Sequence, residues 1–259
     1  MFESLDWSAF AAVASDRRFI AAVLVSALSG LVRGFSGFGS ALIYIPLISA
    51  IYEPRIAAGT LLLIDFVGST PFSIRELPRC NWREVGPIAL AAAVMTPVGT
   101  LALIFANPVV LRWIISVLVL TLLAVLASGW RYRGKPTLPV MAGVGTIAGL
   151  GSGAVQIAGP PVILYWLGGA IKATTARANM IVFFAALGSA ACVSYFFEKL
   201  FTKEALALAL LLGISYTILF LVGALSFHRA SETVYRRIAY AIILISAFVS
   251  LPVFDGFFH

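Results

Sequence analysis

The residues best suited to chemistry lie in a glycine-rich tract that begins near residue 30. From Arg33 to Ser40 the chain reads Arg-Gly-Phe-Ser-Gly-Phe-Gly-Ser, and a short apolar run ending in Pro46 follows. Glycine lets the backbone approach a ligand closely, and a helix that starts after such a tract presents free N–H groups to an anion. The residues predicted to bind an anionic substrate here are Arg33, Gly34, Ser36, Gly37, Gly39 and Ser40.

A second tract of the same kind occurs 115 residues later. Its matching positions are Gly145, Gly149 and Pro161, which correspond to Gly30, Gly34 and Pro46. A glycine break repeated at corresponding places in two halves of an apolar chain indicates a transporter's substrate site. The second set of predicted substrate-binding residues is Gly149, Gly151, Ser152, Gly153 and Gln156. The alternative is that the glycines serve close helix packing, as in small-xxx-small contacts.

Other polar residues in apolar surroundings have two interpretations each. Arg33 either binds substrate at membrane depth or lies in an interfacial loop. Asp65, in the centre of an apolar segment, either pairs with an arginine such as Arg33 or binds a proton that couples transport. Arg177 and Asn179 are predicted to face a substrate cavity, although Arg177 also suits a cytoplasmic loop. Gln156 either lines the site or hydrogen-bonds between helices.

The composition defines the class of protein that must position these residues. The 259 residues are 61% hydrophobic and only 11% charged, whereas soluble domains carry about 25% charged residues. This predicts an all-α polytopic membrane protein. The net charge of +7 is then explained by loops that set orientation, so nucleic acid is not expected as a partner. Cys80 and Cys192 lack metal-ligand spacing, and no disulfide, metal, cofactor or enzymatic activity is expected.

Apolar runs bounded by charges, proline or glycine predict ten segments in two groups of five. The segments are 19–32, 36–51, 56–74, 84–105, 109–130, 137–150, 154–169, 174–197, 204–226 and 233–253. The predicted organisation is an interfacial segment (1–18), a first transmembrane repeat (19–130), a cytoplasmic linker (131–136) and a second repeat (137–253). Five crossings per half would insert the second copy upside down, so two inverted repeats are expected.

Short segments and loop charges bear on topology. Segments 19–32, 36–51, 137–150 and 154–169 are short for a full crossing, so they either cross or form re-entrant hairpins. If the segments alternate, one side receives eleven Lys and Arg residues and the other receives six. The richer side is predicted to be cytoplasmic, which places both termini in the periplasm of a bacterial inner membrane.

One competing motif indicates a protease. Gly34-Phe-Ser-Gly37 reads G-x-S-G, as in intramembrane rhomboid proteases, where the serine needs a histidine base on a neighbouring span. The two histidines are His228, beside Arg229, and His259 at the end of the sequence. Neither lies inside an apolar segment, so this alternative is disfavoured.

The duplicated glycine motif, the paired five-segment halves and the loop Asn81-Trp-Arg-Glu84 resemble the sulfite exporter TauE/SafE family from about Phe19 to Pro252. The first motif departs from the family pattern because Phe35 and Phe38 interrupt its glycines. The resemblance implies a transporter that exports sulfite, sulfoacetate or another organosulfonate by alternating access, with a midplane site between the two breaks. An anion channel is the alternative. The expected partners are a small anion and the lipid bilayer, and a homo-oligomer is possible.

Overall fold

The computed structural model describes residues 7–36, 39–130, 132, 134–166, 171–226 and 232–254. Helix makes up 87% of the structure, and the described residues contain no β-strand. Two short 3-10 helices, η1 (Leu77–Arg79) and η2 (Pro252–Phe254), accompany the α-helices. The all-helical prediction is confirmed.

Polar side chains fix where several helices begin. The side chains of Asn81 and Asn107 accept the backbone N–H two residues further on, at 3.2 and 2.9 Å. The Thr202 hydroxyl accepts the N–H of Ala205 at 3.1 Å. A helix leaves its first N–H groups without carbonyl partners, and these side chains satisfy some of them. The helix starts are therefore encoded locally.

The helices form two compact units, and each unit takes helices from both halves of the sequence. The first unit comprises residues 1–64, 107–123 and 199–259, and the second comprises residues 65–106 and 124–198. The first contains α1 (Trp7–Ser15), α2 (Arg18–Ser36), α3 (Ser40–Ile51), α10 (Lys203–Ser226), α11 (Glu232–Val249), the start of α4 (Pro54–Glu76) and most of α6 (Pro108–Ala127). The second contains α5 (Trp82–Phe105), α7 (Leu138–Val155), α8 (Gly159–Trp166), α9 (Ala173–Phe197) and the remainder of α4 and α6.

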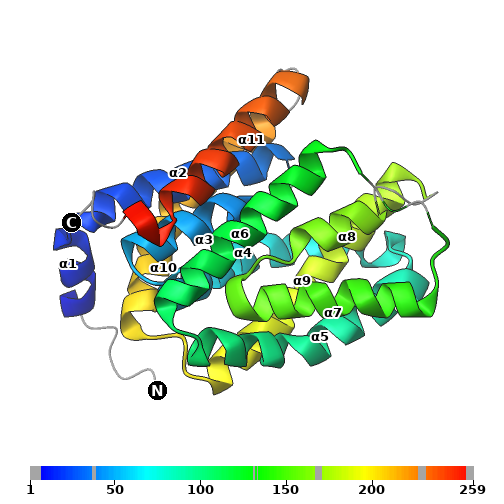
Figure 1. Cartoon of the computed structure of the whole chain (residues 1–259), viewed down its shortest axis with the longest axis horizontal. Helices are drawn as coiled ribbons and strands as arrows, with labels where there is room; N and C mark the ends of the chain where they lie inside the picture. Colours follow the sequence, from blue (N-terminus) through cyan, green and yellow to red (C-terminus); the bar gives the residue numbers. More distant parts are fainter. Residues whose placement is uncertain are drawn as a thin grey trace. The chain divides into compact units, whose positions relative to one another are not determined.

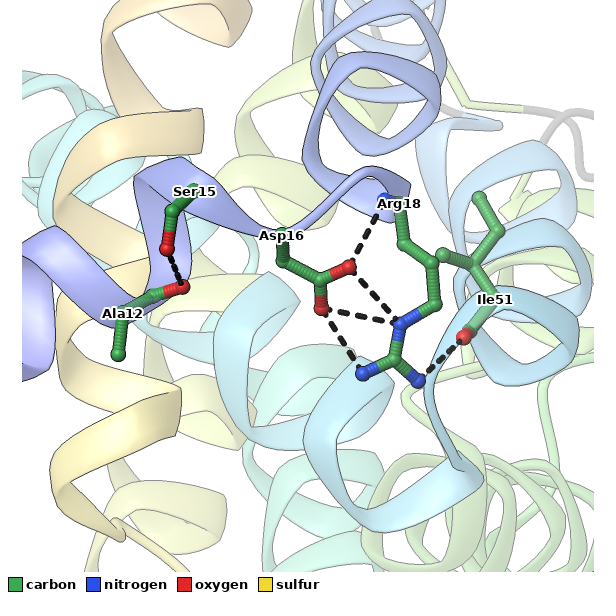
Figure 2. Close-up of polar contacts among 5 residues, drawn as sticks. All are labelled: Ala12, Ser15, Asp16, Arg18 and Ile51. Atoms are coloured by element: carbon green, nitrogen blue, oxygen red, sulfur yellow. Dashed lines mark hydrogen bonds and ion pairs between the residues drawn. The ribbon is translucent and has the colours of Figure 1, made fainter.

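In the first unit, α2 packs along α10, and α3 contacts both α2 and α11. The α2–α3 hairpin begins and ends at the same end of this unit. Figure 2 shows Arg18, the first residue of α2, donating from Nη1 to the carbonyl oxygen of Ile51 at the end of α3, 3.3 Å away. Asp16 holds the same guanidinium in an ion pair of 2.8 Å. These contacts join the short helix α1 to the base of the hairpin.

In the second unit, α5 and α7 lie side by side (Figure 1), and α9 packs on α5. The end of α8 returns to the segment that leads into α7, because the Tyr132 N–H donates to the Leu164 carbonyl at 3.1 Å. At eight residues, α8 is about 12 Å long and cannot cross a hydrocarbon core of about 30 Å by itself. This favours a re-entrant α7–α8 hairpin over two full crossings.

Among the residues that the structure describes, five helices are long and apolar enough to cross a membrane, or six if two bent parts of α4 count as one span. The five are Trp82–Phe105, Pro108–Ala127, Leu138–Val155, Thr174–Phe197 and Lys203–Leu225. In the element order, the first half supplies α2 to α6 and the second half supplies α7 to α11, so each half contributes five helices. The inversion of the second half stays a prediction.

Candidate functional site

The first glycine tract is mostly helical rather than an open break. Arg33 lies in the last turn of α2, and Gly34 and Ser36 belong to the same helix. Gly37 lies outside the described residues. Gly39 precedes α3 with a left-handed backbone (φ 92°), and Ser40 opens α3 with its side chain 1% exposed. Helix is therefore described up to Ser36 and again from Ser40.

The glycines inside α2 allow close approach to α10. A Cβ at Gly30 would overlap the carbonyl oxygen of Tyr216, and one at Gly34 would overlap that of Phe220. One turn earlier on the same face, the Ser26 hydroxyl donates to the Leu212 carbonyl at 2.9 Å. A ridge of small residues spaced by four thus lies against the α10 backbone. For Gly30 and Gly34, helix packing is the role that the structure shows.

The second tract repeats this arrangement within the second unit. A Cβ at Gly145, Gly149 or Gly153 would overlap the carbonyl oxygen of Ile88, Ala92 or Thr96 in α5. All three glycines lie inside α7, which continues to Val155. The expectation that this tract interrupts the helix is therefore wrong: the interruption comes later, at residues 156–158. The glycines stay helical because α5 packs where side chains would otherwise stand.

Gln156 closes the C-terminal end of α7, and its side chain also hydrogen-bonds Tyr195 of α9, as one of its two interpretations predicted. It adopts a left-handed backbone (φ 56°), and its Nε2 donates to the Ser152 carbonyl at 2.9 Å. The Ile157 N–H donates to the Gly151 carbonyl at 3.0 Å. From α9, the Tyr195 hydroxyl donates to the Gly153 carbonyl at 2.8 Å. The last carbonyls of α7 thus already accept hydrogen bonds from the protein.

The helices that follow the two breaks offer different donors. At the start of α3, the residues Ser40 and Ala41 keep backbone N–H groups, and the N–H of Leu42 donates to the Gly39 carbonyl at 3.1 Å. At the start of α8, Pro160 and Pro161 have no N–H at all. The first break is therefore the better anion site by backbone chemistry, a difference that glycine spacing alone did not reveal.

The loops at one end of the second unit hold a buried polar cluster that the sequence identified only in part. The Asn179 Oδ1 accepts the backbone N–H of Asn81 at 2.7 Å, which joins α9 to the start of α5. Asn81 Nδ2 donates to Glu84 Oε1 at 3.0 Å, and Trp166 Nε1 donates to Glu84 Oε2 at 3.0 Å. We call Asn81, Glu84, Trp166 and Asn179 the Asn179 network. Glu84 and Trp166 were missed because neither stands in a glycine tract.

The predicted site residues outside the two glycine tracts differ in how exposed they are. Asn179 is fully buried, whereas Arg177, two residues earlier on α9, is exposed. Arg177 therefore fits a loop-facing role better than a cavity-facing one. Asp65 is half-buried on α4. The histidines considered as protease bases, His228 and His259, lie outside the described residues.

The fold and its apolar helices define a multi-pass membrane protein. The chain belongs to the sulfite exporter TauE/SafE family, whose description it matches over residues 22–249. No curated protein and no solved structure matches it. It is therefore a transmembrane transporter of this family.

Proposed function

We propose that this transporter exports a small sulfur-containing anion, such as sulfite, sulfoacetate or another organosulfonate, by alternating access. The observation that carries the proposal is the family match over residues 22–249, since the family is described as sulfite exporters. An inside-negative potential favours the exit of an anion by about 2.3 kcal/mol per charge per 100 mV. Export of an anion therefore has a driving force without a further energy source.

The chemistry of the breaks supports an anionic cargo. In the first unit, Arg33 lies in the last turn of α2 and α3 begins at Ser40, so a cationic residue and a helix N-terminus flank the first break in the sequence, and both favour an anion. In the second unit, the α7 carbonyls at Gly151, Ser152 and Gly153 are engaged by protein donors, which makes a carbonyl cage for a cation less favourable. Among the sequence-predicted contacts we rank Arg33, Gly39 and Ser40 first, and we place Arg177 last because it is exposed.

The orientation and coupling are parts of the same proposal. The Lys and Arg counts favour a cytoplasmic position for the loops at the Asn179 network and a periplasmic position for both termini, in a bacterial inner membrane. Asp65 is the candidate proton site. An Asp65→Asn variant with full activity and the same pH dependence of flux as the wild type would remove that role.

Counterflow in proteoliposomes tests the function. Vesicles loaded with unlabelled sulfite, sulfoacetate or isethionate should accumulate the labelled anion, and acetate or phosphate should substitute poorly. Arg33→Ala should reduce this uptake at least tenfold, whereas Arg177→Ala should leave it within about twofold. High flux without counterflow would indicate a channel instead. Absence of flux for every sulfur oxyanion would refute the proposed substrate class.

A further inference from the structure

Asn179 carries a buried hydrogen-bond donor that the protein does not satisfy. Its side chain is 0% exposed, and its Nδ2 has no partner. The orientation of the carboxamide is fixed, because turning it over would place the NH2 group against the N–H of Asn81. Buried polar groups are nearly always paired, so a buried NH2 group held in this way calls for an acceptor.

A second unsatisfied group lies beside Trp166, a member of the Asn179 network. The Tyr165 hydroxyl has no partner, although the residue is only 4% exposed. Its ring stacks on Tyr132 with 5.7 Å between ring centres and meets Trp166 edge-on at 6.1 Å. Trp166 in turn belongs to the Asn179 network through Glu84. One hydrogen-bonded network thus ties together α5, α8 and α9, and the last two of these helices each carry an unsatisfied donor.

The charges around this end of the unit favour a negatively charged acceptor. Its exposed cations are Arg75, Arg79, Arg83, Lys135, Lys172 and Arg177. Of the two carboxylates on these segments, Glu76 pairs with Arg79 at 3.3 Å. The other, Glu84, has each oxygen engaged by a donor of the Asn179 network. The cations therefore outnumber the carboxylates, and both carboxylates already have partners.

We propose that Asn179 Nδ2 and the Tyr165 hydroxyl form an oxyanion subsite in the second unit, donating to the sulfonate or sulfite oxygens of the cargo. This inference rests on the proposed function and adds the residues that would recognise the anion at the cytoplasmic loops. Glu84, Asn81 and Trp166 are positioning residues, since they orient the donors without contacting the anion. The competing explanation is that ordered water fills both hydrogen-bonding positions.

Asn179→Asp separates the subsite from a structural role. The aspartate keeps the oxygen that accepts the Asn81 N–H, but it replaces the NH2 donor with a negative charge. In the detergent-purified full chain, burying this charge should lower the melting temperature without ligand, so the anion response is measured against the variant's own ligand-free value. Stabilisation by sulfite, sulfoacetate or isethionate should be lost, and counterflow should fall at least tenfold. If this variant keeps the wild-type anion response, water or structure explains Asn179, and the subsite is refuted.

Tyr165→Phe is the second variant, and it tests the oxyanion subsite even if Asn179→Asp does not fold. Because the hydroxyl has no partner in the protein, its removal should leave the melting temperature unchanged while weakening the apparent affinity for the anion about three- to tenfold. An unchanged affinity would overturn the subsite.

Cys80 supplies a readout that does not depend on transport. It is half-buried and directly precedes Asn81. In a Cys192→Ser background, a saturating anion should slow maleimide labelling of Cys80, and Asn179→Asp should abolish this protection. Labelling that the anion slows equally in Asn179→Asp would contradict the subsite. If no sulfur oxyanion moves or stabilises the wild type, the proposed function falls and the subsite with it.

Discussion

Replacing Gly149 by alanine tests the contact between α5 and α7, and Gly143 offers a matched control on the same helix. A Cβ at Gly149 would overlap the Ala92 carbonyl oxygen, whereas a Cβ at Gly143 would have no atom within 4 Å. Both substitutions remove a helical glycine, which favours the helix by up to about 1 kcal/mol in each case. The difference between the two variants therefore isolates the steric cost.

Overpacking costs about 1–3 kcal/mol, and the upper half of that range applies where the obstacle is backbone that cannot rotate away. For a chain of this size, each kcal/mol changes the melting temperature by roughly 2–4 °C. Gly149→Ala should therefore melt about 4–12 °C below Gly143→Ala. The assay is the fraction of detergent-purified protein that remains monodisperse after heating. Equal melting temperatures would show that α5 and α7 do not meet at Gly149 and would refute the packing argument.

Three further predictions concern the polar contacts. Trp166→Phe leaves a buried oxygen of Glu84 without its donor, so the unfolding free energy should fall by about 1.5–3 kcal/mol. In the Trp166→Phe background, Glu84→Gln should lower the unfolding free energy less than it does in the wild type. Losses that simply add in the double variant would argue against the contact. The hydrogen bond from Arg18 lowers the pKa of Asp16 below its ordinary 3.8, so the pair stabilises the fold at neutral pH and its contribution is lost as the pH falls through that lowered pKa. Because the Arg18 side chain is 54% exposed, the stability lost on acidification should stay below about 1 kcal/mol. Asp16→Asn should therefore reduce the fall of the melting temperature with decreasing pH. If the fall is the same in this variant, groups other than Asp16 cause the acid sensitivity. Burial raises the pKa of the Cys80 thiol above its ordinary 9.0. With Cys192 removed, the rate of maleimide labelling of Cys80 should therefore rise about tenfold per pH unit from neutral pH upward. A labelling rate that levels off below pH 9 would disprove the raised pKa.

The sequence predicted the longer helices well because their ends carry local signals. The segments expected at 84–105 and 204–226 correspond to Trp82–Phe105 and Lys203–Ser226. Each begins at a polar cap, Asn81 or Thr202, and then runs apolar for its whole length. Such information lies within a few residues of the boundary, so it can be read from one sequence.

The glycine tracts were harder to interpret because glycine favours both helix breaks and close helix contacts. The spacing of four between Gly145, Gly149 and Gly153 places them on one face of a helix, and this was the available signal for packing. The same spacing makes the repeat register ambiguous by one turn. Alignment of the two repeats by their glycines matches Gly34 with Gly149. Alignment by the last described residues of α2 and α7, Ser36 and Val155, instead matches Gly34 with Gly153.

Site residues could be predicted from the sequence where a polar residue interrupts an apolar run. They could not be predicted where their role depends on partners far away in the sequence. Asn179 was identified on the first ground. Its link to Asn81 joins residues 98 positions apart, and Trp166 reaches Glu84 across 82 positions. Since nothing local records which helix packs on which, the Asn179 network required the folded structure. Tyr165 was not among the predicted site residues, because only its unsatisfied hydroxyl in the folded structure suggests a role beyond packing.

The composition of the units has a consequence for how the chain assembles during synthesis. The second unit is encoded within residues 65–198, while the first needs residues 199–259 to join helices made at the outset. The ridge of Ser26, Gly30 and Gly34 on α2 must therefore wait in the bilayer until α10 has been translated. A ribosome that stops after α9 would leave a complete second unit attached to an α2 that lacks its contact with α10. Quality control that recognises unpaired small-residue ridges would remove such products, and late truncations should consequently deplete the protein more severely than their length suggests.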